Sequence, residues 1–597
     1  MTFLEKYKRT HSCGELREGD AGKEVVLIGW VSVRRDLGNL IFIDLRDREG
    51  ITQVVFDKGR DGDLHSAASR LKNEFVIGVR GRVAKRLHKN EKIPTGGIEV
   101  IAEELEVINE AETTPFVIEE DVKASEELRL KYRYLDLRRL KNQRALKLRH
   151  LAAQVVRSYL SGLGFIEVET PFLTKSTPEG ARDYLVPSRV QKGCFYALPQ
   201  SPQLFKQLLM CAGLDRYFQI VRCFRDEDLR ADRQPEFTQI DIEASFITRD
   251  DIYEMMSGLV AELWEKVGGR KISLPIDRLT YRDAIDRYGT DRPDRRIPWI
   301  LKDATHIFKD IPFRVTGDVI ASGGIVKGFC IKEGGSKLTK KELEGLAEIV
   351  KPFGANGVLW FRLDDGHLSG VAARYLGEQH VSDLVSFFEA SPPDLILLIA
   401  ADHSTANASL AALRSFLGKR LGVYDSDDLD VVWVTDFPLF EWSNEENRYI
   451  SMHHPFTSPN PEDIHLLEKS PEKVRALAYD IVVNGIEIGG GSIRIHDREL
   501  QKRVFGVLGI KGDEAERRFG FLLEAFRYGA PPHGGIAFGF DRIVMLLAGA
   551  ESIRDVIAFP KTTAAQDLMV DAPSEVDERQ LDELGLCLKR DCQKKGC

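Results

Sequence analysis

Two segments near the middle of the chain alternate polar and apolar residues with a period of two, which is the pattern of β-strands. A charged loop separates them, so the pattern predicts a strand, a loop and a returning strand. The apolar face is expected to pack on a core, and the other face is polar. This polar face carries Gln219, Cys223 and Arg225 from the first strand and Phe237, Gln239, Asp241 and Glu243 from the second.

A second hairpin is predicted at the Asn-Gly pair 484–485, because this dipeptide between alternating apolar runs favours a type I′ turn. Its register places Asp480 and Glu487 on one face, where two carboxylates repel each other unless a cation binds between them. Oxygen ligands of this kind suit Mg²⁺ held together with phosphates. Strict alternation puts Arg494 on the face opposite Glu487, so a shared site requires a bulge in the run of glycines before it.

A third segment, near the C-terminus, is typical of a strand that turns through Gly539 into a helix with the apolar run 543–548. Arg542 then lies in the first turn of the helix, a position that favours an anion over a cation. A bound polyphosphate would supply the missing negative charge. The alternative is an arginine on a solvated helix start, and this segment alone leaves both interpretations open.

The N-terminal region is predicted to be a β-barrel. Residues 1–112 contain five stretches of strand-like alternation, with a glycine-containing turn between the first two, which suggests an OB-fold. Thr113-Thr114-Pro115 opens a linker. The basic amphipathic stretch 126–149 either contacts a nucleic-acid backbone or packs as a hinge helix. The predicted strands are 25–33, 40–45, 52–56, 75–83 and 98–107.

The remaining breaks predict an α+β protein of several domains. One large domain begins at about residue 141 and is interrupted by an insert with strands of its own at 357–361 and 395–400. The predicted division is a barrel (1–112), a hinge (113–140), the two parts of the large domain (141–294 and 430–570), the insert (295–429) and a C-terminal extension (571–597).

The composition narrows the classes of protein that fit. At 597 residues, with 43% hydrophobic and 30% charged residues, the chain is typical of a soluble multidomain protein. The net charge of −9 means that a nucleic acid would be bound by local basic patches. The eight cysteines show no CxxC spacing, and the best apolar run, 395–401, is too short to span a bilayer. We expect a cytoplasmic protein with reduced thiols and no membrane segment.

Taken together and in this order, the hairpins and the strand–helix segment resemble motifs 2 and 3 of the class II aminoacyl-tRNA synthetases. The segment 164–171, GFIEVETP, resembles motif 1, through which these enzymes form dimers. Segments 177–184, TPEGARDY, and 200–206, QSPQLFK, are similar to the bacterial type of aspartyl-tRNA synthetase, and the similarity covers nearly the whole chain. The resemblance implies an antiparallel catalytic sheet flanked by helices, an OB-fold anticodon-binding barrel and an inserted α/β (GAD-like) domain.

The resemblance also implies an activity, that of an aspartate–tRNA ligase. ATP and L-aspartate would form aspartyl-adenylate, and aspartate would then pass to the 3′ end of tRNA-Asp. Mg²⁺ and a homodimer formed through motif 1 are implied as well. Charging of tRNA-Asn stays open, although Leu37 resembles the form restricted to tRNA-Asp. The alternative is a non-catalytic paralogue that binds RNA or senses amino acids, which predicts the loss of an ATP-handling residue; none is lost.

For the nucleotide, the resemblance assigns roles to single residues. Adenylate formation needs positioning and charge stabilisation more than covalent catalysis, so Arg225 and Arg542 are the candidate catalytic contacts to the α- and γ-phosphates. Phe237 would stack on adenine. The other predicted ATP-binding residues are Asp226, Glu227, Gln234, Glu487, Gly539, Phe540 and Asp541, and the predicted Mg²⁺ ligands are Asp480 and Glu487.

For aspartate, an anionic side chain calls for fixed cations, and Lys206 and Arg494 match the family positions that supply them. Asp241 would orient Lys206. His453 matches a mobile loop that closes over aspartate, although a His-His pair before proline is also a common loop feature. The predicted aspartate site is completed by Glu179, Ser201, Gln203 and Arg225.

In the barrel, the positions that match anticodon contacts of the family are Arg35, Phe42, Gln53 and Glu99. Phe42 would stack on a base, and Gln53 and Glu99 would read base edges, as in the recognition of single-stranded RNA. The alternative for each is an ordinary surface residue, or, for Phe42, a residue of the barrel core.

Overall fold

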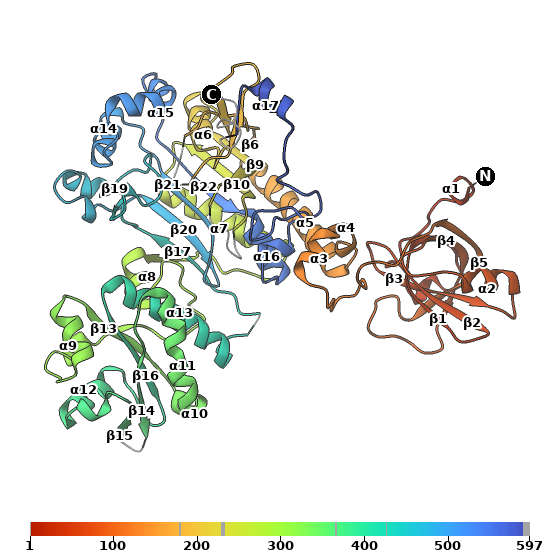
Figure 1. Ribbon diagram of the computed structural model, residues 1–597, viewed down its shortest axis with the longest axis horizontal. Helices are drawn as coiled ribbons and strands as arrows, with labels where there is room; N and C mark the ends of the chain where they lie inside the picture. Colours follow the sequence, from red (N-terminus) through yellow and green to blue (C-terminus); the bar gives the residue numbers. More distant parts are fainter. Residues whose placement is uncertain (1, 178–180, 228–232, 365–366, 426, 589–597) are drawn as a thin grey trace. The chain divides into compact units, whose positions relative to one another are not determined.

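The computed structural model describes residues 2–177, 181–227, 233–364, 367–425 and 427–588 (Figure 1). The chain divides into two compact units. The first comprises Met1–His150, Leu229–Gln234 and Val544–Asp577, and the second comprises Leu151–Asp228, Pro235–Ile543 and Glu578–Cys597. Among the described residues, no helix combines the length and the apolar character needed to cross a membrane.

A closed five-stranded barrel forms the N-terminal part of the first unit (Figure 1). Its strand order is β1-β2-β3-β5-β4, and alternate residues of β2, such as Ile41, Ile43 and Leu45, lie in a fully buried core. The predicted OB-fold is confirmed, and helix α2 was not predicted. The elements are α1 (Phe3–Lys6), β1 (Glu24–Asp36), β2 (Leu40–Arg46), β3 (Ile51–Asp57), α2 (Gly62–Ser69), β4 (Val76–Lys85) and β5 (Ile98–Asn109).

The hinge is built around a buried carboxylate. Asp136 has no solvent exposure, and its side chain accepts hydrogen bonds from Arg133 (2.6 Å), Arg139 (2.9 Å) and Asn142 (3.0 Å). Arg133 also donates to the carbonyl oxygen of Ile557, 2.9 Å away in the same unit. These buried and paired arginines fit the packed-hinge interpretation of the basic stretch. The helices are α3 (Glu126–Lys131), α4 (Arg133–Asp136) and α5 (Leu140–Gly162).

An eight-stranded sheet forms the centre of the second unit, with the order β11-β17-β20-β21-β22-β10-β9-β6 (Figure 1). The predicted antiparallel sheet is confirmed, and one parallel strand is added at each edge. Helix α6 contacts β9 and β10, and α7 contacts β22. The strands are β6 (Ile166–Glu167), β9 (Arg216–Phe224), β10 (Glu236–Ser245), β11 (Asp277–Thr280), β17 (Val431–Thr435), β20 (Ala478–Val483), β21 (Ile486–Ile493) and β22 (His533–Gly539).

Helices and two small hairpins complete this part of the chain. One hairpin pairs β7 with β8 and the other pairs β18 with β19. These elements are β7 (Leu185–Pro187), β8 (Phe195–Ala197), α6 (Gln203–Cys211), α7 (Arg249–Lys266), α8 (Tyr281–Tyr288), β18 (Phe440–Ser443), β19 (Arg448–Ser451), α14 (Arg498–Val507), α15 (Gly512–Phe526), α16 (Phe540–Ala548) and α17 (Glu578–Leu584).

The β20–β21 hairpin contains the bulge that the sequence required. Val482 pairs with Glu487, but Ile481 pairs with Gly489, so Ile488 is an extra residue in β21. The bulge therefore precedes the glycine run, whereas it was predicted within the run. The glycines are needed for another reason, which is the close approach of β22. A Cβ on Gly491 would lie 2.0 Å from the carbonyl oxygen of a residue on that strand.

The insert forms a separate five-stranded sheet within the second unit, with the order β12-β13-β16-β14-β15. It has apolar cores of its own, which contain Phe329 and Phe361. Its two ends meet, because the backbone N–H and the guanidinium of Arg295 donate to the carboxylate of Asp430 at 2.7–3.2 Å. The elements are β12 (Lys302–Asp303), α9 (Arg314–Ala321), β13 (Ile325–Ile331), α10 (Gly334–Lys337), α11 (Lys340–Val350), β14 (Leu359–Asp364), β15 (His367–Ser369), α12 (Glu378–Phe387), β16 (Leu395–Ala401) and α13 (His403–Leu421).

Candidate active site

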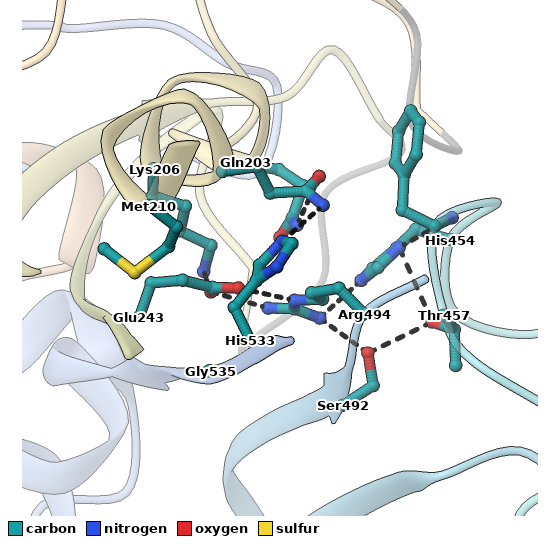
Figure 2. Close-up of polar contacts among 12 residues, drawn as sticks. Gln203, Lys206, Met210, Glu243, His454, Thr457, Ser492, Arg494, His533 and Gly535 are labelled. Carbon is teal, nitrogen blue, oxygen red and sulfur yellow. Dashed lines mark hydrogen bonds and ion pairs between the residues drawn. The ribbon is translucent and has the colours of Figure 1, made fainter. Parts of the chain in front are cut away.

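Two strands and a helix bring charged residues together on one face of the large sheet. Asp241 and Glu243 follow the period-two face of β10, which pairs with β9 so that Asp241 lies opposite Gln219, a residue of the predicted polar face. Lys206 projects from α6 toward this face, and its Nζ lies 2.7 Å from Oδ1 of Asp241. The same Nζ lies 3.2 Å from Oε2 of Glu243 (Figure 2). All three side chains are buried. The predicted contact between Asp241 and Lys206 is therefore present.

Arg494 completes this group, immediately after β21. Its Nε and Nη2 donate to the two carboxylate oxygens of Glu243 at 2.9 and 3.1 Å, and its Nη1 lies 2.6 Å from both the Ser492 hydroxyl and Nε2 of His454 (Figure 2). The bulge in β21 thus brings Arg494 to the same side as Lys206. We refer to Lys206, Arg494, Asp241 and Glu243 as the charged quartet.

The charged quartet is balanced, with two cations and two carboxylates. Burial alone would raise the pKa of Glu243, but Arg494 and Lys206 hold it at about 2. Burial raises the pKa of Asp241 despite the nearby Lys206 ammonium, and its Oδ2 has no hydrogen-bond partner among the described residues. The formal charge of the quartet is zero, so any attraction for an anion would depend on N–H groups of Lys206 and Arg494 that Asp241 and Glu243 do not engage.

The two adjacent histidines occupy different places. Burial and the Arg494 guanidinium hold the pKa of His454 well below its usual range, so a neutral imidazole faces Arg494. His453, which was the predicted residue, instead has its Nε2 3.7 Å from Oδ1 of Asp480 and its ring against Phe437. The contact of His454 with Arg494 was not predicted, because nothing in a His-His-Pro loop indicates which ring turns inward; the role of His453 stays a prediction.

Asp480 and Glu487 form the predicted carboxylate pair. A Cβ placed on Gly490 would lie 2.5 Å from Oδ1 of Asp480 and 3.8 Å from Oε1 of Glu487, so both side chains cover the same glycine. Burial and the Asp480 carboxylate raise the pKa of Glu487. The described residues contain no group of three or more His, Cys, Asp or Glu arranged to hold a metal ion. Two carboxylates alone fit a cation whose other ligands are phosphates and water.

Arg542 adjoins this pair and lies in the first turn of a helix, as the strand–helix prediction has it. Strand β22 ends at Gly539 and helix α16 begins at Phe540, so Arg542 lies in its first turn. Its Nη1 donates to the carbonyl oxygen of Glu487 at 3.0 Å and lies 3.7 Å from Oε2 of the same residue. Asp541, which was predicted to bind ATP, is 3% exposed and accepts a hydrogen bond from the backbone N–H of Thr238. Asp541 therefore ties the start of α16 to β10.

Arg225 follows β9, and its guanidinium lies over the ring of Phe237, 5.1 Å from the ring centroid. Its buried Nε has no hydrogen-bond partner among the described residues. A buried donor of this kind fits a ligand that supplies an acceptor. Asp226 pairs through its backbone with Arg182, and Glu227 is partly exposed at the end of the described loop.

The other predicted residues lie as follows. Gln234, in the first unit, exchanges two hydrogen bonds with the backbone of Lys561. Gln203 is buried and donates to Gln207, which in turn contacts His533 (Figure 2). Glu179 lies outside the described residues. A cavity of about 260 Å³ opens beside Ser201, lined by Thr174, Lys175, Gln200, Ser201, Phe205 and Phe521.

The predicted anticodon residues gather on one outer face of the barrel. Arg35 donates to Asp44 (2.8 Å) and to Gln53 (3.1 Å), and Gln53 donates to Glu99 (2.8 Å). Phe42 pairs with Arg35 across the β1–β2 ladder. It is only half-buried and is absent from the barrel core that its neighbours Ile41 and Ile43 enter. The core interpretation of Phe42 is therefore not supported.

Known families match both parts of the chain. Residues 125–563 match the family described as tRNA synthetases class II (D, K and N), and residues 25–108 match the OB-fold nucleic acid binding domain. Because the first match covers most of the sequence, the chain belongs to the class II tRNA synthetases of the D, K and N group.

Curated relatives in sequence are similar to this chain over nearly its whole length. The aspartate–tRNA(Asp/Asn) ligase of Syntrophotalea carbinolica is 53% identical over 589 residues, which cover 98% of this chain and 99% of that protein. The aspartate–tRNA ligase of Macrococcus caseolyticus is 51% identical over 589 residues, covering 98% of this chain and all of that protein.

Solved structures share the fold. The asparaginyl-tRNA synthetase of Pyrococcus horikoshii complexed with asparaginyl-adenylate has a TM-score of 0.58 at 22% identity, covering 93% of this chain and 98% of that one. The aspartyl tRNA synthetase of Entamoeba histolytica has a TM-score of 0.58 at 20% identity, covering 93% and 91%. At these identities the likeness concerns the fold alone.

Proposed function

We propose that this chain is an aspartate–tRNA ligase, which activates L-aspartate with ATP and transfers it to tRNA. The observation that carries the proposal is the charged quartet. Within the part of the chain that the structure describes, the contacts above leave one N–H of Lys206 Nζ and one of Arg494 Nη2 for a ligand. Donors on two fixed cations favour an anionic side chain, because a charge-assisted hydrogen bond is stronger than one to a neutral amide. Asp241 and Glu243 hold both cations in place.

The nucleotide is assigned to the neighbouring groups. Arg225 is placed to hold the α-phosphate and the attacking carboxylate, Phe237 to stack on adenine and Arg542 to hold the γ-phosphate. Asp480 and Glu487 would hold Mg²⁺ together with the phosphates, and the ion neutralises phosphate charge when bound. The carboxylate pair fits this role, because burial and the Asp480 carboxylate both raise the pKa of Glu487, and a bound cation would favour its ionised form.

A homodimer is part of the proposal. Strand β6 in motif 1 is an edge strand of the large sheet, with the side chain of Ile166 51% exposed, and Phe172 and Leu173 after it are 46% and 54% exposed. An edge strand beside apolar side chains is a surface that proteins usually cover. Free thiols such as those of Cys13, Cys194 and Cys330 fit the cytoplasm, where tRNA is charged.

ATP–pyrophosphate exchange tests the activity directly. We expect exchange with aspartate and none with asparagine, lysine or in the absence of an amino acid. A non-catalytic paralogue would give no exchange with any of them, and exchange driven by asparagine would contradict the role given to the charged quartet. Some curated relatives are named aspartate–tRNA ligase and others aspartate–tRNA(Asp/Asn) ligase. Charging assays with tRNA-Asp and tRNA-Asn therefore determine which of these tRNAs the chain charges.

The insert is expected to be dispensable for activation. Replacing residues 296–429 by a short flexible linker should preserve exchange, because Arg295 and Asp430 already hold the two ends together. The change exposes one side of α8, where the Tyr288 ring lies beneath Arg414 of the insert, so some loss of thermal stability is expected. A folded deletion protein without exchange activity would show that the insert completes the site.

Two substitutions in the barrel are expected to weaken tRNA binding and to leave the activation of aspartate unchanged. Phe42→Ala should weaken tRNA binding by roughly 1–3 kcal/mol, the usual contribution of one base–aromatic stack. Gln53→Ala should cost a similar amount and relax discrimination at one anticodon base. Exchange without tRNA should keep the wild-type rate, and filter binding with wild-type and anticodon-mutated tRNA measures the loss. A fall in thermal stability with no dependence on anticodon sequence would restore the core interpretation of Phe42.

A further inference from the structure

Glu74, in the loop before β4, is a buried carboxylate that the proposed reaction does not use. Its side chain is 5% exposed. Its φ of 65° lies in the left-handed region, which glycine and asparagine adopt more readily than glutamate. Such a conformation persists only where the surrounding contacts hold the residue in place.

The contacts of Glu74 join two parts of the first unit. Arg46 of β2 donates from Nη2 to both carboxylate oxygens at 2.9 and 2.7 Å, and Arg46 is itself 4% exposed. Arg138, between α4 and α5, donates from Nη1 to Oε2 of the same carboxylate at 2.7 Å. Its guanidinium also lies 5.1 Å from the ring centroid of Trp30 on β1. One carboxylate therefore connects the barrel with the hinge.

A second contact between barrel and hinge is weaker. Lys147 of α5 lies 2.7 Å from the carboxylate of Glu49, but these side chains are 42% and 33% exposed. Exposed ion pairs contribute little, because water and salt screen them. The Glu74–Arg138 pair is better shielded, since the side chain of Glu74 is 5% exposed and that of Arg138 is 27% exposed, and its charge-assisted hydrogen bond is therefore stronger. Glu74 is thus the principal ionic link. On the hinge side, Arg138 follows directly on α4, whose Asp136 and Arg133 are locked in the buried network that reaches Ile557.

We propose that Glu74 and Arg138 are positioning residues for tRNA charging, which fix the orientation of the anticodon barrel on the hinge. The inference rests on the proposed function, because it assumes that the barrel binds the anticodon. A small rotation at this junction would move the distant 3′ end of the tRNA by a much larger distance. Misplacement of a reacting group by about 1 Å can cost on the order of 10²-fold in rate.

The primary test is Arg138→Gln in the full-length chain, which removes the charge and leaves the Arg46–Glu74 pair intact. We expect kcat/KM for tRNA charging to fall by about 10–100-fold. Exchange without tRNA should stay within about twofold of wild type, and so should the Kd for an anticodon stem–loop RNA, because that RNA needs the barrel alone. Arg144→Gln is the matched control, since Arg144 is exposed on α5 and carries the same charge.

A second variant, Glu74→Gln, tests the role of the junction independently. Both carboxylate oxygens of Glu74 already accept hydrogen bonds from Arg46, and one of them also from Arg138, so an equal charging defect in this variant would come from the junction, and the double variant should be no worse than either single one. Weaker stem–loop binding by Arg138→Gln would overturn the proposal in favour of a direct RNA contact. An equal defect in Arg144→Gln, or full additivity in the double variant, would also overturn it. If Glu74→Gln does not fold, the Arg138 and Arg144 measurements decide.

Different results would contradict the role of the Glu74–Arg138 junction and the proposed aspartate–tRNA ligase activity. Wild-type protein without aspartate-dependent exchange would contradict the function. The junction would still be judged by comparing the Kd of whole tRNA with the Kd of the stem–loop in the same variants. We expect whole-tRNA binding to weaken in Arg138→Gln while stem–loop binding does not.

Discussion

Replacing Arg494 by leucine is expected to lower kcat/KM for aspartate on the order of 10²–10³-fold. Arg494 is 3% exposed and forms a bidentate ion pair with Glu243. Truncating the protein partner of a buried, hydrogen-bonded charge pair with a ligand costs roughly 2–5 kcal/mol of binding, and about 1.4 kcal/mol corresponds to a factor of ten. Aspartate also loses one of its two cationic donors, so we expect KM to rise and kcat to fall. Exchange kinetics at varied aspartate concentration measure both.

Two comparisons make this result specific. Arg494→Lys retains the charge but loses the planar fork, so its loss should be smaller than that of Arg494→Leu. The KM for ATP should be nearly unchanged in both variants, provided that their thermal unfolding shows a folded protein. An ATP defect of the same size as the aspartate defect would place Arg494 on the nucleotide side and would contradict the role of the charged quartet.

Arg225→Ala and Arg542→Ala are each expected to abolish aspartate-dependent exchange while the protein stays folded. Each change removes a positive charge from the place where phosphate charge develops, a loss of roughly 3–4 kcal/mol, or on the order of 10²–10³-fold in rate. The buried Nε of Arg225, which has no partner among the described residues, fits an acceptor supplied by the ligand. Radiolabelled pyrophosphate exchange at saturating ATP and aspartate measures the effect.

Arg222 offers a matched control on the same strand. It lies on β9 one residue before Cys223, so period two directs it to the other face, where it pairs with Glu236 at 3.2 Å. Arg222→Ala should therefore leave exchange close to the wild-type rate. Near-normal exchange in the Arg225 or Arg542 variant would show that the phosphates are held by other groups.

Local patterns were sufficient to predict much of this fold. Alternation gave the β9–β10 face, and the Asn-Gly turn gave the register in which Val482 pairs with Glu487. The barrel strands were predicted to within a few residues for the same reason. Each of these features depends on neighbours in the sequence, because side-chain period and turn conformation are local properties.

Features that depend on distant strands were not predictable in this way. The sequence required a bulge but placed it among the glycines, whereas β22 packs so closely on those glycines that the extra residue is accommodated earlier, at Ile488. Glu243 was recognised on the polar face but was not assigned to the site, because its partner Arg494 lies about 250 residues away. The choice between His453 and His454 likewise depends on which ring meets Arg494 in the folded chain.

The order of strands in the large sheet has a consequence for synthesis. Strand β10 pairs with β22, so Ile240 must find Phe538, about 300 residues further along the chain. At roughly 5–20 residues per second, the ribosome needs about 15–60 s to make the partner. During this time β10 has an unpaired edge on which neighbouring nascent chains can pair. Once the insert has folded, the ion pair between Arg295 and Asp430 shortens the effective loop between β10 and β22. The entropy cost of closing a loop changes only slowly with its length, however. We therefore expect the nascent chain to depend on chaperones that shield this edge until the last strand emerges.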